Sequence, residues 1–318
     1  EEKNYADAAL RENGFRFFVK NFYENASQLL PYSYLAQDGI SIDWTYWPTR
    51  DQEQRYQLHR HEWMPKQAKA YYVTRDEKYV LGWMEVYLDW HRQNPKPTVQ
   101  LDYSLYPENQ AAEYRNAGWS WRPLDVATRL LGECEIMEYV KTSPSITPEY
   151  LLWFLYHFAE QADHIRGNYS ATSNHLITQA QAVAAAGFLF PEFANADAWI
   201  NSGVGKLNEQ VKAQYYNDGW LMDGDFHYHI SSIEDFRSTL ELAKANGRES
   251  LVTYKNALAA MADVVVNMTF PDYSSVNMTD TRCDTWTKSV LTKNFTRYAG
   301  LFPANGTYAW MATSGASG

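Results

Sequence analysis

The sequence predicts an all-α fold built from antiparallel helix hairpins, because three observations agree. Apolar residues recur at helical spacings of three and four along most of the chain. Alternating apolar and polar residues, the pattern of strands, are scarce. The stretches between periodic segments are short and polar, as at 75–77, 217–219 and 246–247. Helices joined by such short connections are expected to be antiparallel neighbours.

The helices are expected in the following order. In the first part of the chain, apolar spacing predicts helices at about 5–29, 62–74, 77–93 and 124–141. Thr147 as an N-cap and Pro148 at the first helical position then predict a helix that continues to about residue 165. Further stripes of the same spacing predict helices over 176–187, 200–211, 231–245 and 251–265.

The domain organisation follows from these elements. We expect one domain over 1–318, in which 1–55 is a less certain N-terminal arm. Two irregular regions, about 30–55 and 95–118, are rich in Pro, Tyr and polar residues and either cover a cleft or form long surface loops. No repeat of fixed period is visible, which disfavours a regular solenoid. A helical bundle and an α/α toroid both remain open at this point.

The composition favours some classes of binding partner and argues against others. Aromatic residues make up 16% of the chain, with 12 Trp and 24 Tyr, which suits a sugar-binding cleft as well as a core. The net charge of −10 and the lack of a basic stripe argue against nucleic acid. The sequence has no apolar run long enough to predict a membrane span.

Cysteine usage and sequons bear on the compartment. Cys134 and Cys283 are far apart in sequence, so neither a disulfide framework nor a thiolate metal site is expected. We expect no cofactor and no metal. Six Asn-x-Ser/Thr sequons and a first residue other than Met are compatible with a periplasmic or secreted protein.

The first candidate site is Ser173-Asn174-His175, at the beginning of a predicted helix. Ser or Asn at this place is an ordinary N-cap, which is the structural interpretation. The functional interpretation is that a helix N-terminus holds a carboxylate through its N–H groups. An Asn amide that donates to the same carboxylate would make it behave more like a neutral acid.

The second candidate site is the segment 223–229, which is dense in titratable groups. Tyr228 is a candidate proton-transfer group, and His227 and His229 are candidate neighbours that lower its pKa. A metal held by the His-x-His spacing is the competing interpretation. A carboxylate pair formed by Asp223 and Asp225 would instead fit a glycoside hydrolase.

The third candidate site combines arginine with indole rings. Trp119, Trp121 and Arg122 precede a predicted helix. The arginine either makes a cation–π contact in the core or binds a carboxylate or sulfate beside sugar-stacking rings. Arg60 and His61, close to a further Trp, make a similar but weaker case.

At these residues the chain resembles the heparinase III-type polysaccharide lyases. The motifs that carry the resemblance stand in the family's order and cover about residue 55 to the end: Gly-Trp-Ser-Trp-Arg-Pro-Leu at 118–124, Ser-Asn-His at 173–175, Phe-Leu-Phe-Pro-Glu-Phe at 188–193, Asp-Gly at 218–219, Tyr-His at 228–229 and Leu-Phe-Pro-Ala-Asn at 301–305. The Asn-His and Tyr-His pairs are the specific part.

The resemblance implies an incomplete α/α toroid joined to a C-terminal β-sandwich domain, and eliminative cleavage of heparan sulfate or a related acidic glycosaminoglycan. By motif, Asn174 corresponds to the family's carboxylate-neutralising Asn and Tyr228 to its catalytic Tyr, with His175 and His229 in support. The β-sandwich, which carries a catalytic His in the family, is expected beyond residue 318. In place of the family's Ser-Pro before the Tyr, this chain has Asp225-Phe226-His227, which bears on substrate preference.

The expected substrate contacts are side chains that suit an acidic sugar: Trp119, Trp121, Arg122, Arg60, His61 and His227. Three alternatives to a heparan-sulfate lyase stay open. They are a lyase for alginate or another uronate polymer, an α/α-toroid glycoside hydrolase, and a glycan-binding module without catalysis.

Overall fold

The structure is a computed structural model, and it describes residues 2–21, 25–49, 51–276, 278–279, 281 and 286–316. The chain divides into two compact units, Glu1–Tyr169 and Ser170–Gly318, here called unit 1 and unit 2. Cys283 lies outside the described residues, and Cys134 is a free, half-buried thiol. The expectation of one domain over 1–318 with an arm at 1–55 stays a prediction.

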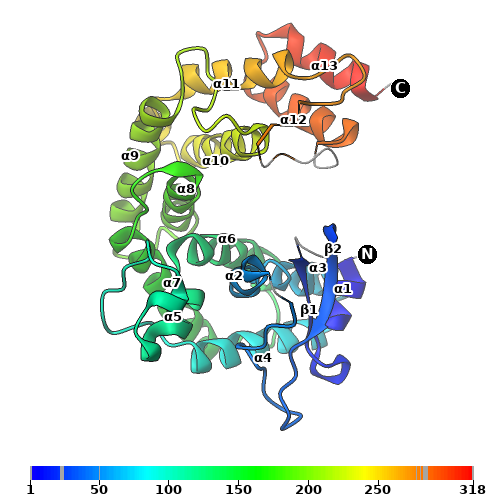
Figure 1. The fold of residues 1–318 in the computed structure, drawn as a ribbon, viewed down its shortest axis with the longest axis vertical. Helices are drawn as coiled ribbons and strands as arrows, with labels where there is room; N and C mark the ends of the chain where they lie inside the picture. The colour runs from blue at the N-terminus through cyan, green and yellow to red at the C-terminus, as the bar shows by residue number, and fades with distance from the viewer. Residues whose placement is uncertain are drawn as a thin grey trace. The chain divides into compact units, whose positions relative to one another are not determined.

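Unit 1 consists mainly of helices and has one pair of strands among its described residues (Figure 1). The α-helices are α1 (Glu2–Ala8), α2 (Gln52–Arg60), α3 (Met64–Thr74), α4 (Lys78–Gln93), α5 (Arg115–Ser120), α6 (Pro123–Val140) and α7 (Pro148–Gly167). The strands are β1 (Arg16–Asn21) and β2 (Asn25–Ser33), and short 3-10 turns lie at Arg11–Asn13, Pro107–Asn109 and Ala112–Tyr114.

The predicted helix at 5–29 is wrong beyond its first turns. The helix α1 ends at Ala8, Gly14 adopts a left-handed backbone, and β1 then pairs antiparallel with β2. The reason is an alternation of period two, in which Phe15, Phe17 and Val19 are all buried. The ring of Phe17 stacks on Trp63 at 3.8 Å between centroids, so the strand is held by packing that a local pattern does not reveal.

The core of unit 1 is aromatic. α3 packs against α1, α4 and α6, and α6 also packs against α2 and α7. The indoles of Trp83, Trp90 and Trp121 are fully buried among these helices. The predicted start of α7 is confirmed, since Thr147 accepts a hydrogen bond from the Tyr150 amide and Pro148 occupies the first turn.

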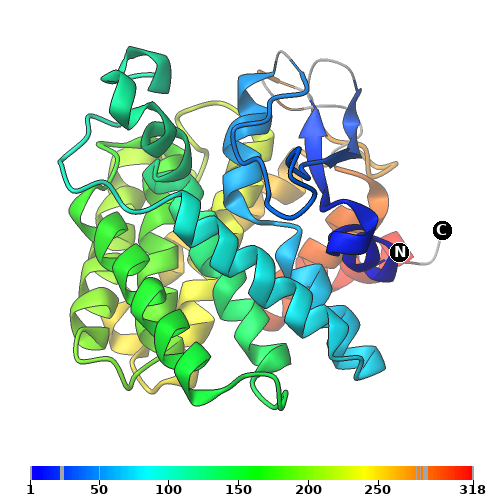
Figure 2. The same cartoon turned by 90° about the horizontal axis from the view of Figure 1, so that it is seen from below.

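In unit 2 the described segments are helices with short connections. The elements are α8 (Ser173–Leu189), α9 (Ala196–Gln214), α10 (Phe226–Ala245), a 3-10 turn at Glu249–Leu251, α11 (Lys255–Asn267), α12 (Lys288–Leu301) and α13 (Gly306–Ala316). In Figure 2 the green helices α8 and α9 run side by side. At the end of the chain α12 and α13 pack on each other.

Two glycines allow α8 and α9 to approach closely as an antiparallel pair. A Cβ at Gly203 of α9 would lie 2.4 Å from the Ala180 carbonyl oxygen, and one at Gly187 of α8 would lie 2.5 Å from the Ala196 carbonyl oxygen. No larger residue fits at either position without moving a backbone. The long alanine-rich face of α8 is therefore fully buried.

The all-α prediction is confirmed, and eight of the predicted helices correspond to α3, α4 and α6–α11. The helices α2, α5, α12 and α13 were not predicted from the sequence. Among the described residues, no helix has the length and apolar character needed to cross a bilayer.

Candidate functional site

The first turn of α8 begins in an unusual backbone conformation. Thr172 is extended, and Ser173 is left-handed with φ +84°, which is uncommon for a residue that has a Cβ. The Ser173 hydroxyl accepts a hydrogen bond from the His175 amide at 3.3 Å. Asn174 and His175 follow in the first helical turn, and both are half-buried. The N-cap residue of α8 is Thr172, whose side chain makes no capping hydrogen bond, so neither Ser173 nor Asn174 is the ordinary N-cap that the sequence suggested.

The first turn of α10 is fixed by a buried carboxylate. Asp225 is the N-cap and is fully buried, and its Oδ1 accepts the Tyr228 amide at 2.8 Å. Its Oδ2 accepts the hydroxyls of Thr279 and Thr281 at 2.5 and 3.1 Å. Because both oxygens are occupied in the interior, Asp225 caps the helix. It is poorly suited to act on a substrate as one half of a carboxylate pair with the exposed Asp223.

Two hydrogen bonds set the register of α8 against α10. Thr178 Oγ1 donates to Asp235 Oδ2 at 2.9 Å, and Gln181 Nε2 donates to Ser238 Oγ at 3.1 Å. The partners are 57 residues apart in both bonds, so the two helices run parallel. Their N-terminal ends therefore lie at the same end of the pair.

The register brings Asn174 and Tyr228 to matching places. Asn174 precedes Thr178 by four residues and Gln181 by seven, which puts it on the face of α8 that contacts α10. Tyr228 precedes Asp235 by seven residues, on the facing stripe of α10. At 1.5 Å per residue, the two residues are offset by about 4.5 Å along the helix axes.

The two histidines beside Tyr228 differ in their surroundings. His227 is half-buried, and its ring centroid lies 5.5 Å from that of Tyr228 and 5.4 Å from that of Trp286. His229 is fully buried, with Nε2 at 3.0 Å from the Met261 carbonyl oxygen and its ring 5.0 Å from that of Trp220. Burial lowers the pKa of His229 to about 4, so this ring is a neutral core group.

The His-x-His metal interpretation does not fit this segment. It requires an extended chain, in which alternate residues point the same way, but 226–245 is helical. His227 and His229 therefore leave the helix on different sides. Within the parts of the chain that the structure describes, no group of three or more His, Cys, Asp or Glu is arranged to hold a metal ion.

The candidate residues of unit 1 form an ionic cluster around a buried carboxylate. Arg60 Nε donates to Asp125 Oδ1 at 2.7 Å, and Arg122 Nε donates to Asp125 Oδ2 at 2.6 Å. The Arg122 guanidinium also lies 3.3 Å from the centre of the Tyr56 ring. Burial alone would raise the pKa of Asp125, but the two guanidiniums hold it below its usual value. Both arginines are thus already paired.

The remaining candidates of unit 1 are core residues. Trp119, Trp121 and His61 have at most 2% of their surface exposed. The Trp121 indole donates to the Asn94 carbonyl at 3.0 Å, and the Trp119 ring packs 4.5 Å from that of Tyr56. Their assignment as substrate contacts stays a prediction, and their burial gives a sugar no ring face to stack on in this conformation. Asp125 was not predicted from the sequence, although the Arg-x-x-Asp spacing from Arg122 could have indicated it.

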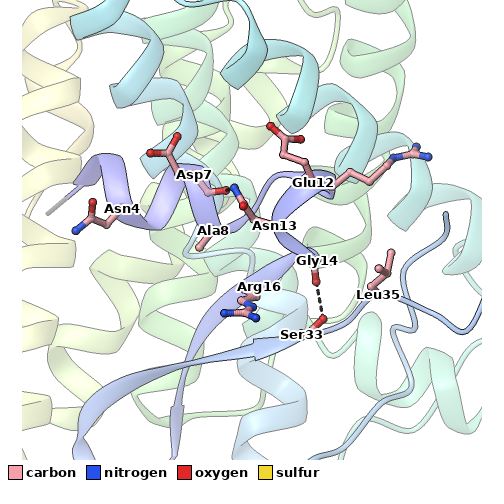
Figure 3. A pocket seen from close by; sticks show the side chains of 10 residues that line it. Asn4, Asp7, Ala8, Glu12, Asn13, Gly14, Arg16, Ser33 and Leu35 are labelled. Carbon is pink, nitrogen blue, oxygen red and sulfur yellow. Dashed lines mark hydrogen bonds between the residues drawn. The ribbon is translucent and has the colours of Figure 1, made fainter. Parts of the chain in front are cut away.

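A hollow in unit 1 is separate from all of these residues. It has a volume of about 620 Å³ and lies where α1, the start of β1 and the end of β2 meet (Figure 3). Its lining includes Asp7, Glu12, Arg16 and Ser33, and the Ser33 hydroxyl donates to the Gly14 carbonyl at 2.7 Å. None of the candidate site residues predicted from the sequence lines this hollow.

Comparison with known proteins gives a consistent result. The family model described as Heparinase II/III N-terminus matches residues 1–310. A heparin-sulfate lyase of Bacteroides thetaiotaomicron is 40% identical over 328 residues, covering 100% of this chain and 44% of the relative. A heparin-sulfate lyase of Bacteroides stercoris is 37% identical over 322 residues, covering 100% and 46%.

Solved structures agree with the sequence comparison. A crystal structure of heparinase III matches with a TM-score of 0.85 at 39% identity, covering 98% of this chain and 46% of that one. The chain therefore spans about half the length of the proteins it matches.

Proposed function

This chain belongs to the heparinase II/III family as an N-terminal helical domain, and from that premise we propose that it supplies Asn174 and Tyr228 to a lyase for uronate-containing glycosaminoglycans. The observation that carries the proposal is the register of α8 and α10. It places an amide and a phenol on facing stripes at the same end of two parallel helices. The relatives named above are heparin-sulfate lyases, which supports a heparan-sulfate-like substrate.

Asn174 is suited to bind the uronate carboxylate. Abstraction of the C5 proton places negative charge on that carboxylate, so a donor aimed at it stabilises the transition state. The side-chain amide of Asn174 is such a donor, and it stands in the first turn of α8, where the helix dipole also favours an anion. One donor of this kind contributes on the order of 3–4 kcal/mol to transition-state stabilisation.

Tyr228 is suited to move protons on the facing helix. Elimination takes the proton from C5, forms the C4–C5 double bond and breaks the bond from C4 to the glycosidic oxygen. A phenol held by the first turn of α10 donates its proton to the departing oxygen, or acts as base and acid in turn. The half-buried ring of His227 lies beside Tyr228 and is the candidate to orient it and to contact the sugar.

The charge of the chain favours a sparsely sulfated substrate. A net charge of −10 repels a dense polyanion, so a lightly sulfated heparan sulfate is a better partner than heparin. Alginate, also a uronate polymer, is the second substrate to test. Action on such polymers fits a periplasmic or secreted location, which we include in the proposal.

The decisive experiment measures unsaturated product. The complete gene product is incubated with heparan sulfate, chondroitin and alginate, and the ultraviolet absorbance of the unsaturated uronate is followed. We expect a rise with heparan sulfate that Tyr228→Phe abolishes and that Asn174→Ala slows by about 10²–10³-fold. The matched control is Tyr216→Phe, the same substitution at an exposed tyrosine of unit 2, which should leave turnover unchanged.

Other outcomes separate the alternatives. Saturated reducing ends, lost in Asp223→Asn but kept in Tyr228→Phe, would indicate a hydrolase and overturn the proposal. Binding of the polymers without any product would indicate a glycan-binding module.

A further inference from the structure

The backbone at Ser173 is strained directly before the residue proposed to bind the carboxylate. A left-handed φ of +84° is unfavourable for serine, because its Cβ crowds the backbone there. Such conformations persist only where the surrounding structure holds them, and they concentrate at functional sites. The groups that hold Ser173 are therefore of interest.

A buried glutamine from the neighbouring helix holds the Ser173 carbonyl. Gln214 is the last residue of α9, and 7% of its surface is exposed. Its Nε2 donates to the Ser173 carbonyl oxygen at 3.0 Å and to Gln210 Oε1 at 2.7 Å. Both hydrogens of the amide are thus used, and Gln210 fixes the direction of the side chain.

A second buried glutamine holds the beginning of the same turn. Gln179 of α8 accepts the Ser170 amide at 2.8 Å through Oε1 and donates to the Ser170 hydroxyl at 2.9 Å through Nε2. It is 1% exposed. The turn 170–173 is therefore held at one end by its own helix and at the other end by α9.

We propose that Gln214 is a positioning residue for Asn174, an inference that rests on the function proposed above. The carbonyl that Gln214 holds belongs to the peptide unit that also contains the Asn174 nitrogen. Its orientation sets the direction of the Asn174 Cα–Cβ bond and of the Asn174 N–H. Gln214 thus aims the carboxylate-binding amide without touching the substrate.

The first test is kinetic and uses the complete gene product. Gln214→Met keeps the volume but removes the donor, so the Ser173 peptide is free to rotate. We expect kcat to fall by about tenfold to a hundredfold with little change in KM, since small displacements of a reacting group have effects of this size. Gln67→Met, a change of the same type at a buried glutamine of unit 1, should leave kcat unchanged.

A pH profile separates positioning from a general loss of structure. In Gln214→Glu the ionised carboxylate cannot donate, whereas the protonated acid can. We expect the ratio of variant to parent kcat to rise as the pH falls. In Gln214→Met the same ratio should stay flat. A flat ratio in both variants, or an unchanged kcat in Gln214→Met, would overturn the inference.

A second readout does not depend on lyase activity. Amide hydrogen exchange should be faster across the turn 170–173 and the first turn of α8 in Gln214→Met than in the parent, and unchanged there in Gln67→Met. An inactive parent protein with this exchange pattern would refute the lyase function while retaining the role of Gln214 in the turn. Unchanged exchange would refute that role itself.

Discussion

Thr178 Oγ1 donates a hydrogen bond to Asp235 Oδ2 at 2.9 Å and so joins α8 to α10 one turn beyond Asn174. Burial raises the pKa of Asp235 from 3.8 to about 7, although the Thr178 hydrogen bond opposes the shift. The carboxyl group therefore titrates near neutrality in the middle of the helix pair. The bond that aligns the two candidate catalytic residues is also a source of pH dependence.

Replacement of Asp235 by Asn should stabilise the protein increasingly as the pH rises. A carboxyl group whose pKa is raised on folding favours the folded state below its unfolded pKa of 3.8, and this contribution is lost as the pH rises to about 7. Asn stays neutral and still accepts from Thr178. The difference in Tm between Asp235→Asn and the parent should grow between about pH 4 and pH 7 and stay constant above pH 7. A difference in Tm that is the same at every pH would contradict the raised pKa.

Removal of the buried cap at Asp225 should destabilise unit 2. Asp225→Ala leaves the Tyr228 amide and the hydroxyls of Thr279 and Thr281 without their acceptor. We expect a loss of about 0.5–2 kcal/mol for the cap, with a further cost for the two buried hydroxyls. Urea unfolding measures the change, and Asp223→Asn, at an exposed position, is the control. Equal effects of the two variants would argue against a structural role for Asp225.

The sequence was sufficient to predict most helices but not the site's geometry. Helices such as α7 and α10 have apolar stripes that repeat along the chain, and Thr147 and Pro148 mark a start locally. The strand β1 was missed because its buried face is specified by contacts such as Phe17 with Trp63, which join distant segments. In the same way, a bond between residues 57 apart has no local signature.

The individual site residues could be named from motifs, yet their surroundings could not. Asn174 and Tyr228 were predicted from motifs. That they lie at the same end of two parallel helices follows only from the hydrogen bonds that set the register of α8 against α10. The left-handed Ser173 was not predictable, because the sequence has serine where that conformation usually selects glycine. Composition also could not show that Trp119 and Trp121 are buried.

Asn174→Asp should reduce turnover more than Asn174→Ala does. Alanine removes one donor to the uronate carboxylate, which corresponds to about a 10²–10³-fold loss of kcat. Aspartate adds a negative charge that repels the same carboxylate and so also weakens binding. Steady-state kinetics of the complete gene product on heparan sulfate separate the two effects, with KM raised in Asn174→Asp. A more active Asn174→Asp than Asn174→Ala would contradict the assigned role.

Acid should destabilise the protein through its buried histidines, and His91 offers the clearest test. Burial, followed by the nearby His157 and Arg129, lowers the pKa of His91 well below 6.5. A histidine whose pKa is lowered on folding contributes full stability above the unfolded pKa of 6.5, and the contribution is lost as the pH falls below that value, because the unfolded state then binds more protons. The ring packs 4.6 Å from that of Tyr87 and 4.0 Å from that of His157, so an aromatic replacement keeps a ring partner for both.

His91→Phe should therefore make the unfolding free energy less dependent on pH between about pH 7 and pH 5. The slope of the unfolding free energy against pH is about 1.4 kcal/mol per pH unit for each proton by which the unfolded and folded states differ. His91→Phe removes the proton that the unfolded state binds at residue 91. Urea unfolding at several pH values measures the slope. Asp235→Asn is the control with the opposite pH dependence. Its unfolding free energy relative to the parent should fall as the pH falls, whereas that of His91→Phe should rise. If His91→Phe and the parent kept the same slope, His91 would have to titrate alike in the folded and unfolded states.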